Sequence, residues 1–192
     1  MSGTNENGQE EGEFKIVFTG PMGAGKTTAI GAISDVAPVR SEVVNTDRNA
    51  HAKETTTVGF DFGRIALPNG QVVRLYGTPG QTRYRFMWDI VSRGAAGVIL
   101  LLDATQPGAL VQMDQYLEAF RPLIPSGAIV IGVGRTGEAG ALGSEAFTSR
   151  LDTHGVLLPV LSVDVRRRAD VMMLVQTLVC ILDAQAPRET IA

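Results

Sequence analysis

The chain has 192 residues, of which 44% are hydrophobic and 19% charged, and its formal net charge is −3. This length and composition are typical of one globular domain with a buried core, and the charge excludes a strongly basic nucleic-acid-binding protein. The single cysteine, Cys180, excludes an internal disulfide and is typical of a reducing compartment. No apolar run reaches the roughly 20 residues of a membrane helix.

The two ends of the chain differ from its centre. Residues 1–13 are polar, include four glutamates and carry a charge of −4, which leaves +1 for the remainder. They show no apolar periodicity, so we expect a disordered acidic tail, one domain over residues 14–185 and a flexible C-terminus over 186–192. Neither end carries a signal-peptide pattern or a lipidation motif. We therefore expect a cytoplasmic protein without a direct membrane anchor.

Residues 20–28, Gly-Pro-Met-Gly-Ala-Gly-Lys-Thr-Thr, lie between a strand-like run (14–19) and a helix-like run (27–34). They match the pattern G-x-x-x-x-G-K-[ST] at every specified position. The glycines allow successive backbone N–H groups to surround phosphate oxygens, and the helix N-terminus adds partial positive charge. Lys26 reaches the outer phosphates and the Thr27 hydroxyl ligates Mg²⁺. This phosphate loop, residues 20–28, predicts binding of a nucleoside triphosphate, against the alternative of a flexible glycine turn.

Strand-like and helix-like segments alternate along the rest of the chain. Residues 35–56 have no clear period and are expected to form a long loop, which in a compact domain is usually functional. A Pro-Asn-Gly turn then joins two strand-like runs into a hairpin, 58–67 and 71–76. Further strands are expected over 97–102, 128–133 and 157–163, and helices over 108–120, 144–151 and 171–182. This order predicts an α/β fold with a mostly parallel six-stranded sheet, one antiparallel edge hairpin and helices on both faces.

The same order, with a hairpin after the long loop, resembles that of Ras-like small GTPases, and so implies a P-loop NTPase G domain. Residues 57–62, Thr-Val-Gly-Phe-Asp-Phe, resemble their switch I segment, and residues 77–81, Gly-Thr-Pro-Gly-Gln, stand in the place of switch II. The resemblance implies that Thr57 meets Mg²⁺ and the γ-phosphate, with Thr55 and Thr56 as neighbouring alternatives.

The switch II residues carry two further implications of this resemblance. Gly80 matches the glycine whose N–H contacts the γ-phosphate, and Gln81 matches the glutamine that orients the attacking water. Gly77, however, stands where most of these families carry an aspartate that holds a Mg²⁺-bound water. Asp61 is the nearest motif-linked carboxylate; the alternative is that it is a strand residue facing solvent.

A glycine followed by Thr-Pro-Gly-Gln resembles the bacterial MglA-like and roadblock-associated Ras-like GTPases, as do the strings at 55–58, 61–65 and 86–88. In those relatives the missing aspartate coexists with hydrolysis. The resemblance implies a roadblock-type regulatory protein as partner and identifies no effector. Aromatic and basic residues after the glutamine are typical of interface anchors, and we expect a partner to contact Tyr84, Arg85 and Trp88.

The base-recognition signature of the family, Asn-Lys-x-Asp, is absent from the expected place. Residues 134–137 read Gly-Arg-Thr-Gly there, followed by Glu138. The usual aspartate accepts two hydrogen bonds from guanine, which is the physical basis for choosing GTP over ATP. Arg135 can line the base with its alkyl stem, and Glu138 is a candidate replacement for the carboxylate. In the last base loop, Ser162-Val163, we expect the N–H of Val163 to face the base.

The sequence therefore predicts a nucleotide switch that binds GTP with Mg²⁺ and hydrolyses it slowly, because no arginine is identifiable as a built-in finger. Two alternatives remain open: a pseudo-GTPase that acts as a binding scaffold, and an ATP-using P-loop kinase. The predicted catalytic residues are Lys26, Thr57 and Gln81, and the predicted metal ligands are Thr27 and Thr57. The predicted nucleotide-binding residues are Gly20, Gly23, Ala24, Gly25, Lys26, Thr27, Thr28, Gly80, Arg135, Ser162 and Val163.

Overall fold

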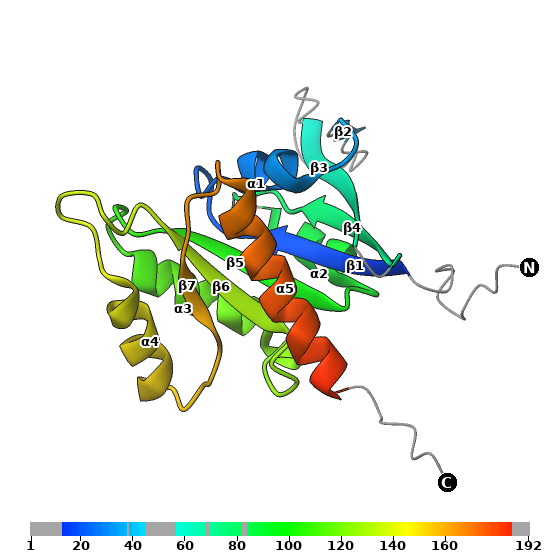
Figure 1. Cartoon of the computed structure of the whole chain (residues 1–192). Helices are drawn as coiled ribbons and strands as arrows, with labels where there is room; N and C mark the ends of the chain where they lie inside the picture. Colours follow the sequence, from blue (N-terminus) through cyan, green and yellow to red (C-terminus); the bar gives the residue numbers. More distant parts are fainter. Residues whose placement is uncertain (1–12, 38, 45–56, 68–69, 82–83, 186–192) are drawn as a thin grey trace, which may run out of the picture.

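The computed structural model describes residues 13–37, 39–44, 57–67, 70–81 and 84–185. A seven-stranded sheet runs through this part of the chain in the order β2-β3-β4-β1-β5-β6-β7 (Figure 1). Its strands are β1 (Glu13–Thr19), β2 (Val39–Val44), β3 (Thr57–Ala66), β4 (Val72–Gly77), β5 (Gly97–Asp103), β6 (Ile129–Gly134) and β7 (Val160–Ser162). The helices are α1 (Lys26–Ile33), α2 (Arg85–Ser92), α3 (Ala109–Ala119), α4 (Ser144–Thr153), α5 (Arg168–Gln185) and the short 3-10 helix η2 (Arg121–Leu123).

The sheet is parallel from β4 through β1, β5 and β6 to β7, and antiparallel where β3 pairs with both β4 and β2. Every residue of β5 is buried, because helices cover both faces of the sheet and a central strand then needs apolar side chains on both sides. The predicted α/β architecture is confirmed. The carboxyl ends of β1, β5 and β6 meet at one edge, which is where open parallel sheets bind ligands.

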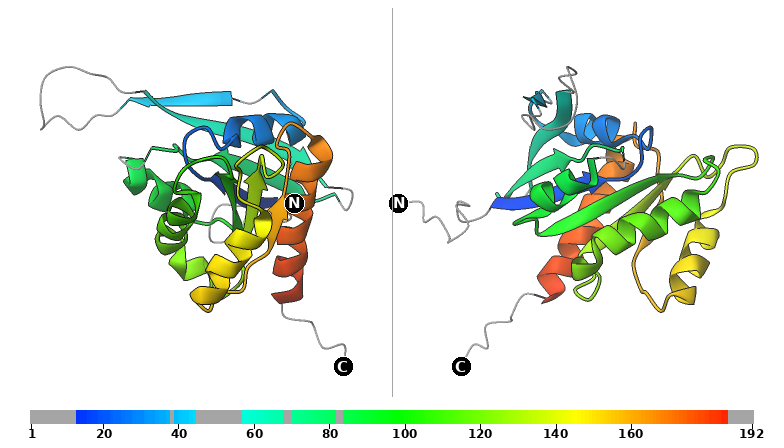
Figure 2. Two further views of the ribbon diagram at one scale, coloured as in Figure 1. Left: turned by 90° about the vertical axis from the view of Figure 1, so that its left-hand side faces the viewer. Right: turned by 180° about the vertical axis from the view of Figure 1, so that it is seen from behind.

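Two apolar clusters fill the space between the sheet and its helices, one on each face. Val98, Leu100 and Leu102 of β5 pack toward α2, α3 and α4, whereas Ile99 and Leu101 pack toward α1 and α5. This division follows from the alternation of side chains along a strand. The two helical layers on opposite sides of the sheet are visible in Figure 2.

Two predicted elements differ from the structure. Residues 39–44, expected within a loop, form β2, which pairs antiparallel with β3 from Val39 opposite Phe62 to Val44 opposite Thr57. The segment lacks a clear period of its own, and the open edge of β3 supplies the hydrogen-bonding partner. The sheet thus has one strand more than predicted. The last strand is shorter than expected: it spans Val160–Ser162 instead of 157–163, and Leu157, which lies before it, is 92% exposed.

The N-terminal boundary of the domain lies one residue earlier than expected. Glu13, assigned to the acidic tail, opens β1 and forms an ion pair with Arg74 of β4. Residues 1–12 and 186–192, predicted to be flexible, lie outside the described residues. In the described part of the chain, no helix has the length and apolarity required to cross a bilayer.

Candidate functional site: a phosphate loop and an adjoining cavity

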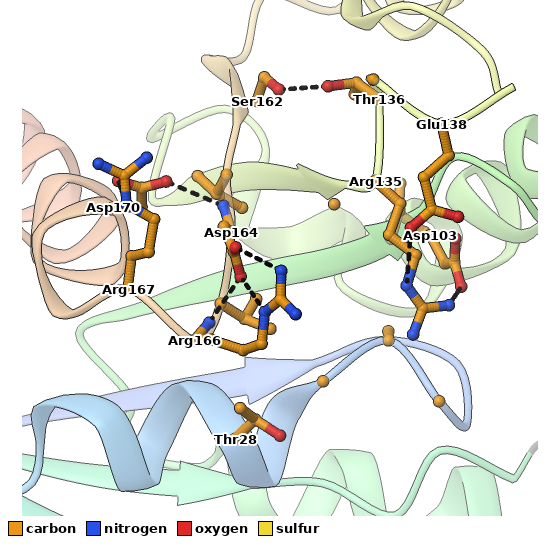
Figure 3. A pocket seen from close by; sticks show the side chains of 18 residues that line it. Thr28, Asp103, Arg135, Thr136, Glu138, Ser162, Asp164, Arg166, Arg167 and Asp170 are labelled. Carbon is orange, nitrogen blue, oxygen red and sulfur yellow. Dashed lines mark hydrogen bonds and ion pairs between the residues drawn. The ribbon is translucent and has the colours of Figure 1, made fainter.

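A cavity of about 640 Å³ opens beside the phosphate loop (Figure 3). Its walls come from the loop, the carboxyl ends of β5 and β6, the segment after β7 and the start of α5. The volume lies within the range of small-molecule and cofactor sites. Segments that are far apart in sequence therefore form one ligand-sized site at the edge where the parallel strands end.

The backbone of the phosphate loop requires glycine at two of its positions. Gly20 has φ 137°, and a Cβ there would lie 2.0 Å from the carbonyl oxygen of Leu101. Gly25 has φ 90°, and a Cβ there would lie 2.7 Å from Val165. Gly25 is also the N-cap of α1 and makes no side-chain capping bond, so the first N–H groups of the helix have no side-chain acceptor from the cap. Such N–H groups are suited to phosphate oxygens.

Lys26 places a nearly buried cation inside this loop. Its Nζ donates hydrogen bonds to the carbonyl oxygens of Gly20 (2.7 Å) and Pro21 (2.8 Å), and the residue is 8% exposed. Burial lowers the pKa of Lys26 to about 8, although the charge of Asp61 opposes this shift. A cation held in this way gains strongly from an anionic ligand, because a charge-assisted hydrogen bond replaces the lost hydration.

Asp61 supplies the carboxylate that position 77 lacks. It lies opposite Gly77 in the β3–β4 pair, and the hydroxyl of Thr27 donates a 2.5 Å hydrogen bond to its Oδ2. A Cβ on Gly77 would lie 3.0 Å from the Cβ of Asp61 and 3.2 Å from its Oδ2, so the glycine leaves room for this side chain. The alternative that Asp61 is simply a strand residue facing solvent is therefore wrong, because its carboxylate accepts a hydrogen bond from Thr27.

The Thr27 hydroxyl and the Asp61 carboxylate are hard oxygen donors of the kind that Mg²⁺ prefers. The described residues contain no cluster of three or more His, Cys, Asp or Glu side chains that could hold a metal alone. A site with few protein oxygens is typical of Mg²⁺ that is shared with substrate phosphates and water. The residues present therefore fit Mg²⁺ bound together with a nucleotide.

The predicted switch residues are only partly described. Thr57 opens β3 opposite Val44, but its side chain lies outside the described part, and so do Thr55 and Thr56. Gly80 packs directly on the phosphate loop: a Cβ there would lie 2.5 Å from the backbone nitrogen of Met22 and 2.8 Å from Lys26 Nζ. Only a glycine allows this approach. The backbone of Gly80 thus adjoins Lys26, as a γ-phosphate contact requires.

Gln81 and Trp88 follow on the switch II side. The amide of Gln81 donates to the sulfur of Met22 at 3.8 Å, which places this side chain against the loop. Trp88, expected to anchor a partner, is only 2% exposed: its indole donates to the carbonyl oxygen of Pro79 (2.9 Å) and stacks on Tyr116 with ring centroids 4.3 Å apart. The helical period turns Trp88 toward the core, so its prediction as an interface residue is wrong.

The exposed face of α2 carries a different set of residues. Phe86 is 51% exposed and Ile90 53% exposed, and Arg85 is also exposed. Tyr84 lies just before the helix and is half-buried. The apolar patch expected on the switch II helix is therefore present, but Phe86 and Ile90 form it in place of Trp88.

Arg135 forms the centre of an ionic network at the end of β6. Its Nη1 lies 2.5 Å from Oδ2 of Asp103, and its Nε lies 3.9 Å from Glu138. Burial raises the pKa of Asp103, but hydrogen bonds from Thr105 and the charge of Arg135 outweigh it and hold this pKa below its usual value. Arg135 lines the cavity, and its role beside the base stays a prediction.

In the loop after β7, the backbone N–H of Val163 has a different partner from the one that the sequence predicts. The N–H of Val163 donates to the carbonyl oxygen of Val133 at 3.0 Å and extends the pairing of β6 and β7. Because this N–H already has a partner in the sheet, the prediction that it faces the base is wrong. Ser162 does line the cavity, and its hydroxyl lies 2.5 Å from that of Thr136, a residue that sequence reasoning did not assign to the site.

The chain is similar to several known Ras-related and GTP-binding proteins. No family model matches the chain. It is 29% identical over 131 residues to the Ras-related protein RabC of Dictyostelium discoideum, and 27% identical over 125 residues to the Ras-related protein RABA2a of Arabidopsis thaliana. It is also 26% identical over 155 residues to the GTP-binding protein ypt3 of Schizosaccharomyces pombe.

The matched regions cover 66%, 63% and 74% of this chain and 61%, 52% and 68% of the three relatives, respectively. The chain thus spans about half to two thirds of the length of these proteins. Together with the architecture, the similarities show a P-loop GTPase α/β fold and support a Ras-like small GTPase. The three relatives are eukaryotic, so the resemblance to the bacterial MglA-like group stays a prediction.

Proposed function

We propose that this protein is a nucleotide switch that binds GTP with Mg²⁺ and hydrolyses it slowly to regulate a partner protein. The observation that carries the proposal is the meeting of four groups at one phosphate loop: the ammonium of Lys26, the hydroxyl of Thr27, the carboxylate of Asp61 and the backbone of Gly80. Together they match the requirements of a triphosphate with its metal. The similarity to Ras-related proteins supports the choice of GTP.

In this proposal, Lys26 and the N–H groups of the loop hold the β- and γ-phosphates. Thr27 would hold Mg²⁺, which would supply positive charge against the phosphate oxygens, and Asp61 would orient the Thr27 hydroxyl and water at the metal. Gln81 leaves the sulfur of Met22, a weak acceptor, to position the attacking water. Thr57 adds a hydroxyl from the start of β3. Hydrolysis is slow because no arginine of the sequence is identifiable as a finger, a group that contributes about 10³- to 10⁵-fold in rate.

We further place the protein in the bacterial MglA-like, roadblock-associated group, on the strength of Gly77 and the Thr-Pro-Gly-Gln that follows it. A roadblock-type regulator is the partner that this placement implies. The exposed face of α2, with Arg85, Phe86 and Ile90, offers it aromatic, apolar and basic contacts.

Phosphate release from GTP by the purified protein tests this function, with Gln81→Ala as the comparison. We expect slow release by the parent protein and a further loss of at least about tenfold in the variant, in line with a group that acts in proton transfer or water positioning. GTP binding without hydrolysis would instead establish the scaffold alternative. Phosphoryl transfer that requires an added acceptor molecule would establish a kinase.

A further inference from the structure

We propose that two neutral hydroxyls, those of Thr136 and Ser162, read the edge of the bound base, so that the site accepts adenine and guanine triphosphates with similar affinity. This inference rests on the proposed function, because it assumes that a triphosphate binds at the phosphate loop. The two hydroxyls lie 2.5 Å apart and line the same cavity as the loop. Figure 3 shows them across the cavity from Thr28 of α1.

Their position suits the base for a geometric reason. Phosphates held by the loop and by α1 fix one end of the nucleotide, so the base extends toward the opposite wall of the cavity. The side chains of Thr136 and Ser162 form part of that wall, at the ends of β6 and β7. The Val163 N–H next to them already donates to a carbonyl oxygen of the sheet, so it does not compete with the two hydroxyls for the base.

A charged reader of guanine would have to come from the carboxylates that line the cavity, and among the described residues each of these is next to an arginine. Asp103 pairs with Arg135 at 2.5 Å and Asp164 pairs with Arg166 at 2.7 Å. The remaining two make looser pairs, Glu138 with Arg135 (3.9 Å) and Asp170 with Arg167 (3.8 Å). Asp170 also accepts the backbone N–H of Asp164.

Because Asp103 and Asp164 are each held closely by an arginine, neither is well suited to recognise guanine. A carboxylate that leaves an arginine to bind guanine exchanges one charge-assisted interaction for another, so its net gain is small. Glu138 makes the longest of these ion pairs, and its side chain is 60% exposed. It is therefore the alternative guanine-binding residue that the experiment must test.

The chemistry of a hydroxyl explains the expected lack of selectivity. Guanine presents two N–H donors, N1–H and the 2-amino group, whereas adenine presents the N1 acceptor beside the 6-amino donor. A carboxylate accepts only, so it favours guanine and repels the lone pair of adenine N1. Each hydroxyl has one donor and two acceptor sites and rotates to suit its partner, so the pair can satisfy either edge.

Dissociation constants of non-hydrolysable GTP, ATP and ITP analogues, measured by calorimetry at one Mg²⁺ concentration, test the inference. We expect all three within about tenfold of one another, the discrimination that one neutral hydrogen bond supplies. ITP lacks the 2-amino group, so a carboxylate reader would lose affinity for it. A preference for GTP over ATP of more than about tenfold overturns the inference. If that preference disappears in Glu138→Gln, Glu138 is the residue that reads guanine.

Two variants of Thr136 give the complementary test. Thr136→Asp places a carboxylate beside Ser162 and should raise the ratio of GTP to ATP affinity at least about tenfold, because charge-assisted bonds are roughly twice as strong as neutral ones. Thr136→Val keeps the shape, removes the hydroxyl and should weaken both nucleotides alike. The inference would be overturned if Thr136→Val bound both nucleotides as tightly as the parent protein does. It would also be overturned if folded Thr136→Asp had the same ratio of GTP to ATP affinity as the parent.

The outcomes separate this inference from the proposed function. Absence of binding to every triphosphate, by parent protein shown to be folded by circular dichroism, would refute the proposed function and the base reading with it. Tight binding of GTP alone would refute only the base reading and leave the switch intact. If Thr136→Asp fails to fold, the parent's GTP, ATP and ITP affinities and the valine variant still decide the question.

Discussion

Asp61 and Thr27 are 34 residues apart in sequence, yet the Thr27 hydroxyl donates a 2.5 Å hydrogen bond to the Asp61 carboxylate beside the phosphate loop. Asp61 lies on β3, directly opposite Gly77 on β4. A carboxylate from the neighbouring strand thus reaches the space that a side chain at position 77 would occupy. The residues that resemble switch II lack an aspartate at position 77, and Asp61 places a carboxylate beside that position next to the phosphate loop.

Replacement of Asp61 by asparagine should weaken the Mg²⁺ dependence of triphosphate binding. The amide keeps the shape but loses the charge that orients Thr27 and coordinated water, and such outer groups are worth about 10- to 100-fold in metal affinity. Titration of Mg²⁺ at constant nucleotide measures the effect. Asp152→Asn, an exposed carboxylate on α4, is the control. Equal Mg²⁺ dependence in parent and Asp61→Asn would remove Asp61 from the site.

Gly77→Asp should be harmful by itself, although it introduces the aspartate that most Ras-like small GTPases carry at the matching place. Its Cβ would lie 3.0 Å from that of Asp61, and two carboxylates would share one space. Overpacking of this kind costs about 1–3 kcal/mol of unfolding free energy, and like charges add to the cost. Urea denaturation measures the loss.

The double variant Asp61→Gly with Gly77→Asp moves the carboxylate from one strand to the other. It should recover both stability and Mg²⁺ dependence relative to Gly77→Asp, because the close contact and the like-charge pair are both removed. A double variant no better than Gly77→Asp would show that the two positions do not share this space.

Triphosphate binding should take up a proton at a pH just above 8. The pKa of Lys26 in the free protein is lowered to about 8 by burial, so above that pH a growing fraction of the side chain is neutral. Phosphate favours the charged form and raises this pKa, so binding adds a proton and affinity falls as the pH rises through 8. Calorimetry in two buffers of different ionisation enthalpy detects the uptake.

Two outcomes bear on the role of Lys26. Identical heats in the two buffers would contradict the lowered pKa of Lys26, since no proton would then move on binding. Lys26→Ala should nearly abolish triphosphate affinity, because the phosphates lose the cation that the loop carbonyls hold in place. An alanine variant with the affinity of the parent would exclude the loop as the binding site.

Tyr116 should help to position switch II. Its hydroxyl donates to the carbonyl oxygen of Gly80 at 3.3 Å, and burial raises the pKa of Tyr116, so the hydroxyl stays protonated. Tyr116→Phe removes this bond alone. We expect GTP hydrolysis to fall severalfold while the dissociation constant of GDP, which has no γ-phosphate, is unchanged, a loss of about 1 kcal/mol of positioning. Equal rates in both proteins would make Tyr116 purely structural.

The single tryptophan of the chain gives this prediction an internal reporter. Trp88 stacks on Tyr116 and donates to Pro79, next to Gly80. Its fluorescence should therefore differ between the diphosphate complex and the complex with a non-hydrolysable triphosphate. The difference should be smaller in Tyr116→Phe, where the hydrogen bond between α3 and Gly80 is lost.

The sequence by itself determined the phosphate loop and the layered α/β architecture. Both depend on local properties: glycines at positive φ within nine consecutive residues, and apolar runs long enough for strands buried on two faces. The roles of Gly80 and Gln81 were predicted from the resemblance of their short motif to switch II, and they stay predictions. Such features need no knowledge of what packs against them.

Tertiary structure alone decided the rest. The open edge of β3 made residues 39–44 a strand, and helical packing turned Trp88 inward. Strand pairing brought Asp61 opposite Gly77 and took up the N–H of Val163, while the ends of β6 and β7 brought Thr136 to Ser162. In each case the partners are distant in sequence, so their contact depends on strand order and register, which no local pattern of residues encodes.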